Sequence, residues 1–128
     1  MVGPRKSIKQ VKPRPVNTPT VRTEFYLNKI VQGQSFLTVA RYLSTRSIYL
    51  KALIEPASAQ AAQCVDLEFQ LPNTNQTIWA KGCIVPPSAS MPEQGLTEVR
   101  FVQLRQEHQQ LIAAYVDEAL KLADPQAA

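Results

Sequence analysis

Hydrophobic and polar residues alternate along most of the chain between residues 20 and 104. The clearest segment is VDLEFQL, in which Val65, Leu67, Phe69 and Leu71 share one face and polar side chains share the other. A period of two is typical of an antiparallel strand that has one face in a core. The same pattern, together with turn-forming residues at 32–33, 72–73 and 86–95, predicts six strands. These are residues 20–28, 34–43, 47–54, 64–71, 77–85 and 97–104.

The period changes after the last predicted strand. The segment EHQQLIAAYVDEALKLA predicts an amphipathic helix over residues 107–123, which ends before Asp124 and Pro125. The helix either packs its apolar face across the mouth of its own barrel or presents that face to a partner. We therefore predict a mostly β fold, a six-stranded antiparallel β-barrel with a C-terminal α-helix. The apolar face consists of Leu111, Ile112, Tyr115, Val116, Ala119 and Leu120.

Charge divides the chain into a basic lead and a nearly neutral remainder. The chain has 128 residues and a formal net charge of +4, with 14 basic and 10 acidic residues. Residues 1–19 contain no acidic residue, so the excess positive charge lies there. We expect a basic flexible lead at 1–19, one barrel-and-helix domain at 20–123 and a short tail at 124–128. The basic residues of the lead are Arg5, Lys6, Lys9, Lys12 and Arg14.

The first residues and the two cysteines predict the compartment. The start MVGPRKSIKQ lacks the apolar stretch of a secretory signal, and no run approaches the ~20 apolar residues of a membrane span. We expect a soluble, cytoplasmic protein.

Cys64 and Cys83 each stand among β-type residues, which predicts small buried apolar side chains. Two thiols without a nearby histidine make a poor metal site.

The sequence contains no recognisable catalytic constellation. His108 is the only histidine, stands near the start of the predicted helix and has no nucleophile nearby in the sequence. We expect it to lie on the surface, and we expect a protein that is not an enzyme and needs no cofactor.

Four segments together carry a resemblance to a known family. RYLSTRSIYLKA, from Arg41 to Ala52, places a serine-containing turn between two strands, and VDLEFQLP follows as the next strand. IWAKGCIV supplies a strand with Gly82, and GLTEVRFVQL precedes the helix. In this order the chain resembles the PilZ domain, a bacterial module that commonly binds cyclic di-GMP.

The resemblance implies where a ligand would bind. The family holds cyclic di-GMP with an Arg-x-x-x-Arg lead and an Asp/Asn-x-Ser-x-x-Gly turn. Carried over by position, the turn here has Tyr42, Ser44 and Ser47, and the lead has Gln10 and Arg14, so only Ser44 and Arg14 match. Three groups of the motif are replaced. Tyr42 has no carboxylate or amide for the guanine edge, Gln10 has no guanidinium fork, and Ser47 stands in place of the flexible glycine.

Another register of the lead would retain more positive charge. Arg5 and Lys9 have the spacing of the two arginines, and Lys12 with Arg14 would also supply two charges, although lysine lacks the planar fork.

These features predict a non-enzymatic PilZ-like regulatory or adaptor domain with weak or no cyclic di-GMP binding. The resemblance implies a protein partner in motility, type IV pilus function or exopolysaccharide control. One alternative is a true cyclic di-GMP receptor that uses the other register. A second is a small single-stranded nucleic-acid binder. Against it we count the missing charge excess after residue 19 and the alternation of Phe69, Trp79 and Phe101, which is more typical of a core or of one sheet face than of a stacking platform.

Overall fold

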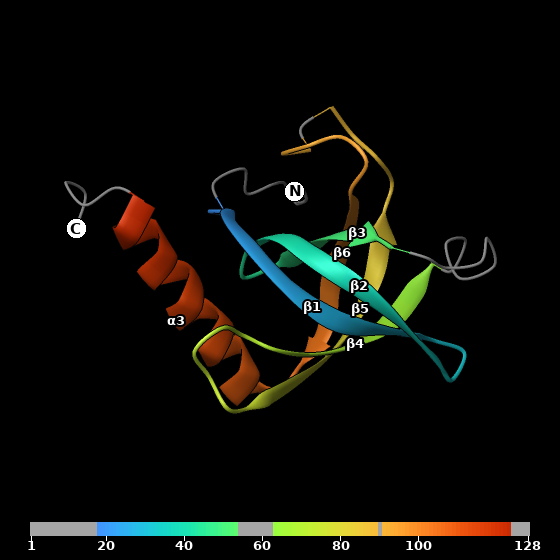
Figure 1. Cartoon of the computed structure of the whole chain (residues 1–128), viewed down its shortest axis with the longest axis horizontal. Helices are drawn as coiled ribbons and strands as arrows, with labels where there is room; N and C mark the ends of the chain where they lie inside the picture. Colours follow the sequence, from blue (N-terminus) through green and yellow to red (C-terminus); the bar gives the residue numbers. More distant parts are fainter. Residues whose placement is uncertain (1–17, 54–62, 90, 124–128) are drawn as a thin grey trace, which may run out of the picture.

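The computed structural model describes residues 18–53, 63–89 and 91–123, which form a closed antiparallel barrel and one helix (Figure 1). The strands follow one another around the barrel in the order β1-β2-β3-β6-β5-β4. This arrangement confirms the predicted PilZ-like fold, a six-stranded antiparallel barrel with a C-terminal helix. The elements are β1 (Val21–Val31), β2 (Gln34–Leu43), β3 (Ser47–Ala52), β4 (Cys64–Gln70), β5 (Thr77–Val85), β6 (Thr97–Leu104) and α3 (Gln106–Ala123). The predicted lead and tail lie mostly outside the described residues, so the division into segments stays a prediction.

The inward side chains of every strand fill the barrel. In β4 the predicted alternation is confirmed, since Val65, Leu67 and Phe69 are all buried and the residues between them face outward. The predicted bounds of β2, β5 and β6 agree with the structure. β1 continues three residues beyond its predicted end, because Gln32 and Gly33 adopt positive φ values of 51° and 82° in a tight hairpin turn that keeps Val31 paired with Gln34.

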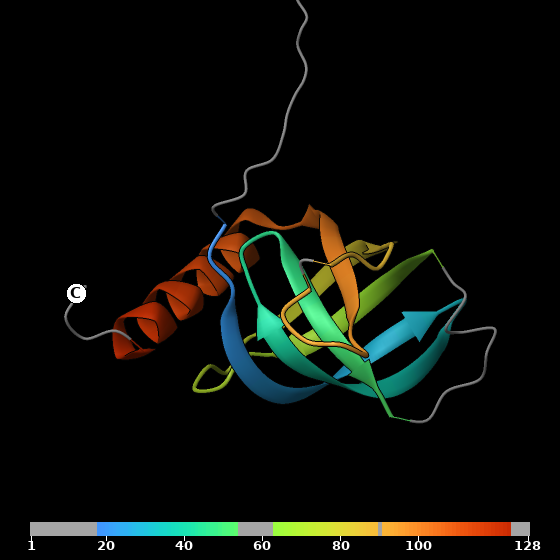
Figure 2. The same ribbon diagram turned by 90° about the horizontal axis from the view of Figure 1, so that it is seen from above.

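The helix α3 packs on its own barrel. Ile112 is 0% exposed and Val116 is 3% exposed, and both belong to the barrel core. Near them, the hydroxyl groups of Thr23 and Tyr115 share a hydrogen bond of 2.6 Å between β1 and α3. The C-terminal end of the helix extends beyond the strands in Figures 1 and 2, so Leu120 is exposed although the sequence pattern placed it on the apolar face.

The predicted surface position of His108 is wrong. This residue is 6% exposed, and its Nδ1 lies 3.4 Å from the backbone N of Trp79, which donates a hydrogen bond to it. His108 belongs to the first turn of α3, and this hydrogen bond places its imidazole against the backbone of β5. Of the two positions that the alternation allowed for Trp79, the core and one face of the sheet, the structure has the outer face, because Ile78 and Ala80 point inward and Trp79 is 51% exposed.

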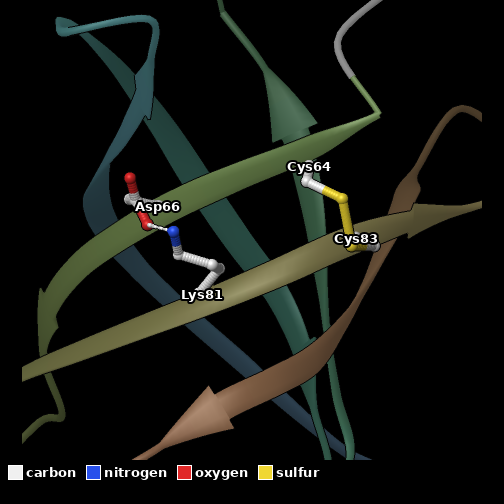
Figure 3. Close-up of a disulfide and its surroundings, with 4 residues drawn as sticks. All are labelled: Cys64, Asp66, Lys81 and Cys83. Carbon is white, nitrogen blue, oxygen red and sulfur yellow. Dashed lines mark ion pairs between the residues drawn. A yellow bond between two sulfur atoms is a disulfide. The ribbon is translucent and has the colours of Figure 1, made fainter.

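The predicted role of the cysteines is wrong as well. Cys64 and Cys83 stand directly opposite each other in the β4–β5 pairing and form a disulfide, with their Cα atoms 4.0 Å apart (Figure 3). Cys64 is exposed, so it does not serve as a small buried apolar side chain. Disulfides are rare in a reducing cytoplasm, so this bond argues against the predicted cytoplasmic location. That location stays a prediction.

Candidate functional site

The turn between β2 and β3 is closed by the serine that matches the ligand motif. The Ser44 backbone N donates to Ser47 O at 2.8 Å. The Ser44 hydroxyl oxygen accepts hydrogen bonds from the backbone N of Arg46 at 3.2 Å and of Ser47 at 3.0 Å. Ser44 is 3% exposed, so its hydroxyl lies inside the turn. A serine used in this way shapes the backbone and presents little of its own polar surface to a ligand.

Ser47 occupies the glycine position of the motif and has a structural partner. Its hydroxyl donates to Glu98 Oε2 on β6 at 2.8 Å, and Ser47 is 3% exposed. Arg100 Nη2 lies 3.5 Å from the same carboxylate oxygen. Among the described residues that are not glycine, only Gln32 and Asn73 have positive φ, so the backbone at Ser47 accommodates a side chain without strain.

Tyr42 occupies the position of the guanine-reading residue and also contacts the protein itself. Its hydroxyl donates to Glu93 Oε1 at 3.2 Å, and its ring meets Tyr49 edge-on with centroids 6.4 Å apart. Arg41 Nη2 lies 3.8 Å from the other oxygen of Glu93. Burial raises the pKa of Tyr49, and the carboxylate of Glu98 raises it further.

Two carboxylates therefore stand beside the turn, Glu93 from the loop between β5 and β6 and Glu98 from β6. Neither carboxylate could be assigned to the turn from the sequence, because each follows its partner, Tyr42 or Ser47, by 51 positions and only the closed barrel brings the pair together. Like charge beside a phosphate disfavours binding, and the arginines at this place are already partly neutralised.

The structure brings together only part of the predicted site. Tyr42, Ser44 and Ser47 lie at one end of β2 and β3. The candidates from the lead, Arg5, Lys9, Gln10 and Arg14, lie outside the described residues, and their part in ligand binding stays a prediction.

A second surface lies on the outside of the barrel. Tyr26, Leu37 and Trp79 are 67%, 52% and 51% exposed. The strand register places Leu37 beside Asn28, Asn28 beside Glu68 and Glu68 beside Trp79, in one row across four strands. Tyr26 lies outside this row, on the same face of β1 and two residues before Asn28. We call Tyr26, Leu37 and Trp79 the outer apolar patch. Exposed aromatic and large apolar side chains gathered on one face are typical of interaction surfaces.

Metal and membrane sites receive no support from the described part of the chain. Within residues 18–53, 63–89 and 91–123, no three His, Cys, Asp or Glu side chains come together as a metal ion would need. Nor does this part contain a helix with the length and apolar character needed to cross a membrane.

The fold is that of a PilZ-like barrel, and the serines of its β2–β3 turn, the candidate ligand turn, make hydrogen bonds within the protein. Comparison with models of known protein families gives no match, and comparison with curated proteins gives none either. Among solved structures, the chain is similar to the Bacillus subtilis inhibitor of motility, MotI/DgrA, with a TM-score of 0.63 and 13% sequence identity over 96% of this chain. At that identity the likeness shows the fold alone. The match spans 58% of the length of MotI/DgrA.

Proposed function

We propose that this chain is a non-enzymatic, PilZ-like regulatory or adaptor domain that acts through protein–protein interaction and binds cyclic di-GMP weakly or not at all. The observation that carries the proposal is the closed β2–β3 turn. Ser44 and Ser47 are both 3% exposed, and their hydroxyls are bonded within the protein. A ligand would have to break these bonds before it could use the same groups, which costs free energy.

Motility control is the setting that the structural comparison supports. The similar solved structure is titled an inhibitor of motility, and we extend that setting to this chain as part of the proposal. Type IV pilus and exopolysaccharide control remain the other settings that the family resemblance implies. A protein partner is consistent with the outer apolar patch, since aromatic side chains such as Tyr26 and Trp79 contribute much of the binding energy at interfaces.

Calorimetric titration of the full chain with cyclic di-GMP tests the proposal. We expect no saturable heat at micromolar concentrations of ligand. Binding at micromolar affinity or tighter would overturn the proposal and favour a receptor that uses Arg5 and Lys9 or Arg14. A second titration uses a chain that begins at residue 18 and therefore lacks Arg5, Lys9 and Arg14. A receptor that binds cyclic di-GMP through these residues would lose its affinity in this shortened chain.

A single-stranded nucleic-acid binder is a second candidate, which the exposure of Trp79 and Tyr26 favours. Both rings present surface on which bases could stack. Glu68 stands directly beside Trp79 in the strand register, and its negative charge opposes a phosphate backbone. Fluorescence anisotropy with an oligothymidylate probe tests this candidate: affinity that falls steeply with salt and is lost in Trp79→Ala would favour it over the adaptor function.

A further inference from the structure

A cleft of about 580 Å³ lies where the β2–β3 turn, the second half of β6 and the start of α3 meet. In Figure 2 the turn between β2 and β3 lies beside β6 close to the point where α3 begins. The walls include Arg46 from the turn, Arg100 and Val102 from β6, and Gln110 from α3. The three described candidate ligand residues, Tyr42, Ser44 and Ser47, do not line this cleft, although it borders the same turn through Thr45 and Arg46.

Among the described residues, no strand pairs with this edge of β6 inside the cleft beyond the contact of Phe101 with Arg46. β3 pairs with β6 only as far as Ser47 and Arg100, and one more backbone bond joins Phe101 N to Arg46 O at 2.9 Å. The chain that precedes β3 turns away from β6 at this point. β6 itself continues to Leu104 and pairs with β5 on its other side. An open strand edge can pair with an extended peptide through backbone hydrogen bonds. The edge is short, because Leu104 O already accepts a hydrogen bond from the Gln109 side chain at 2.9 Å.

The charge of the cleft selects among extended peptides. Arg46 is exposed, the Arg100 side chain is 54% exposed, and none of the described residues that line the cleft is acidic. Glu98 lies 3.5 Å from Arg100 and partly neutralises it, but the Arg100 side chain is itself 54% exposed, so its guanidinium group keeps a face toward solvent. Arginine binds carboxylates with paired hydrogen bonds, so the cleft is complementary to acidic side chains.

Val102 adds an apolar contact beside the two arginines. Its side chain is 57% exposed, and it stands where the β5–β6 register shifts between Lys81 and Gly82, so that one residue of β6 has no direct partner. Irregularities of this kind turn a side chain away from the sheet. An apolar side chain of a bound peptide would cover Val102 and remove its surface from water.

We infer that this cleft binds a short acidic segment of a partner protein in extended conformation. The segment lies along the edge of β6, places carboxylates on Arg46 and Arg100, and packs an apolar side chain on Val102. The inference rests on the proposed adaptor function and names the kind of partner that the adaptor binds.

Fluorescence anisotropy with the full chain tests the inference. The probe is a short fluorescein-labelled peptide of alternating glutamate and valine, and its counterpart has lysine in place of glutamate. We expect saturable binding of the acidic peptide alone. Charge reversal by Arg46→Glu and Arg100→Glu should weaken it roughly tenfold or more. The matched control, Arg22→Glu with Lys51→Glu, changes the net charge equally at exposed strand positions outside the cleft and should retain the affinity.

Two further variants protect the test against a folding defect. Arg46→Glu alone changes an exposed turn residue, and Val102→Gln removes the apolar contact while leaving both arginines; each should weaken binding without lowering the melting temperature. Absence of saturable binding, equal binding of the lysine peptide or of an oligothymidylate, or equal weakening in the control variant would overturn the inference. Displacement of the peptide by cyclic di-GMP would also overturn it.

The proposed function and the cleft inference fail in different titrations. Tight cyclic di-GMP binding that leaves the peptide affinity unchanged overturns the proposed function and supports the inference that the cleft binds an acidic peptide. Absence of both cyclic di-GMP binding and peptide binding overturns the inference about the cleft, and the adaptor function then rests on the outer apolar patch.

Discussion

Ser47 donates its hydroxyl to the carboxylate of Glu98 across the β3–β6 pairing, with 2.8 Å between the two oxygens. Ser47 is 3% exposed and the Glu98 side chain is 13% exposed, so water competes little for this hydrogen bond. A glycine at position 47, as the PilZ pattern has, could not make it. The bond explains why serine is suited to this position in the present chain: it gives a carboxylate near the turn a neutral donor.

The Ser47–Glu98 bond should be measurable in the free energy of unfolding. We expect Ser47→Ala to lower it by about 2 kcal/mol, since the carboxylate loses a charge-assisted hydrogen bond in a shielded position. Urea denaturation measures the loss. In a Glu98→Ala background the same substitution should cost much less, and Ser35→Ala, at an exposed position of β2, should change stability by about 0.5 kcal/mol or less. An equal loss with and without Glu98 would show that the bond does not stabilise the fold.

Phe69 and Trp79 provide a test of the barrel register. The Phe69 side chain is 3% exposed and its ring stacks on Phe25 with centroids 5.6 Å apart, so Phe69→Ala should cost about 3 to 5 kcal/mol. Trp79 is larger but 51% exposed, and Trp79→Ala should cost about 1 kcal/mol or less. Thermal or urea denaturation of both variants makes the comparison. Equal losses in the two variants would contradict the assignment of Phe69 to the inner face and Trp79 to the outer face.

The disulfide should stabilise the barrel against the unfolded chain. Cys64 and Cys83 are separated by 19 positions, and a cross-link of that length contributes about 3 kcal/mol by restricting the unfolded state. Reducing agent should therefore lower the urea midpoint of the native chain. It should leave the midpoint of a Cys64→Ser, Cys83→Ser double variant unchanged. Titration of free thiols in protein taken directly from cells would contradict the cross-link if it found two thiols per chain.

The fold was predictable where the alternation of residue types is regular. The bounds of β2, β5 and β6 follow from it, but β1 appeared to end at Asn28 because the next inward position is Lys29, a charged residue that is only 6% exposed. A charged side chain at an inward position breaks the hydrophobic pattern although the strand continues. Local patterns therefore fail where the barrel interior accepts a polar group.

Contacts that depend on register could not be read from the sequence. Cys64 meets Cys83 only because β4 and β5 pair in a register set by the turn at 71–76, and His108 is covered only because α3 begins over β5. The position of the ligand turn was predicted from Ser44, but the carboxylates beside it come from a distant loop and strand. Residue types and spacing therefore located the candidate site, whereas its electrostatics required the closed barrel.

Restoring the family pattern should create affinity for cyclic di-GMP. In the triple variant Gln10→Arg, Tyr42→Asp, Ser47→Gly, the new guanidinium group and base-edge acceptor each contribute on the order of 1 to 3 kcal/mol as charge-assisted hydrogen bonds. We expect calorimetry to show at least roughly tenfold tighter binding than for the native chain. Glu93 now accepts a hydrogen bond from Tyr42 and would instead face a carboxylate, so adding Glu93→Gln should tighten binding further.

A misplaced arginine provides the control for this gain. Gln34→Arg with Tyr42→Asp and Ser47→Gly has the same charge and the same turn, but it carries the guanidinium group at an exposed end of β2. This control should bind more weakly than the triple variant, because charge alone does not form the paired contact with a phosphate. Equal affinity of the two variants, or no gain in either, would contradict the placement of Gln10 and Arg14 opposite the turn that Ser44 closes.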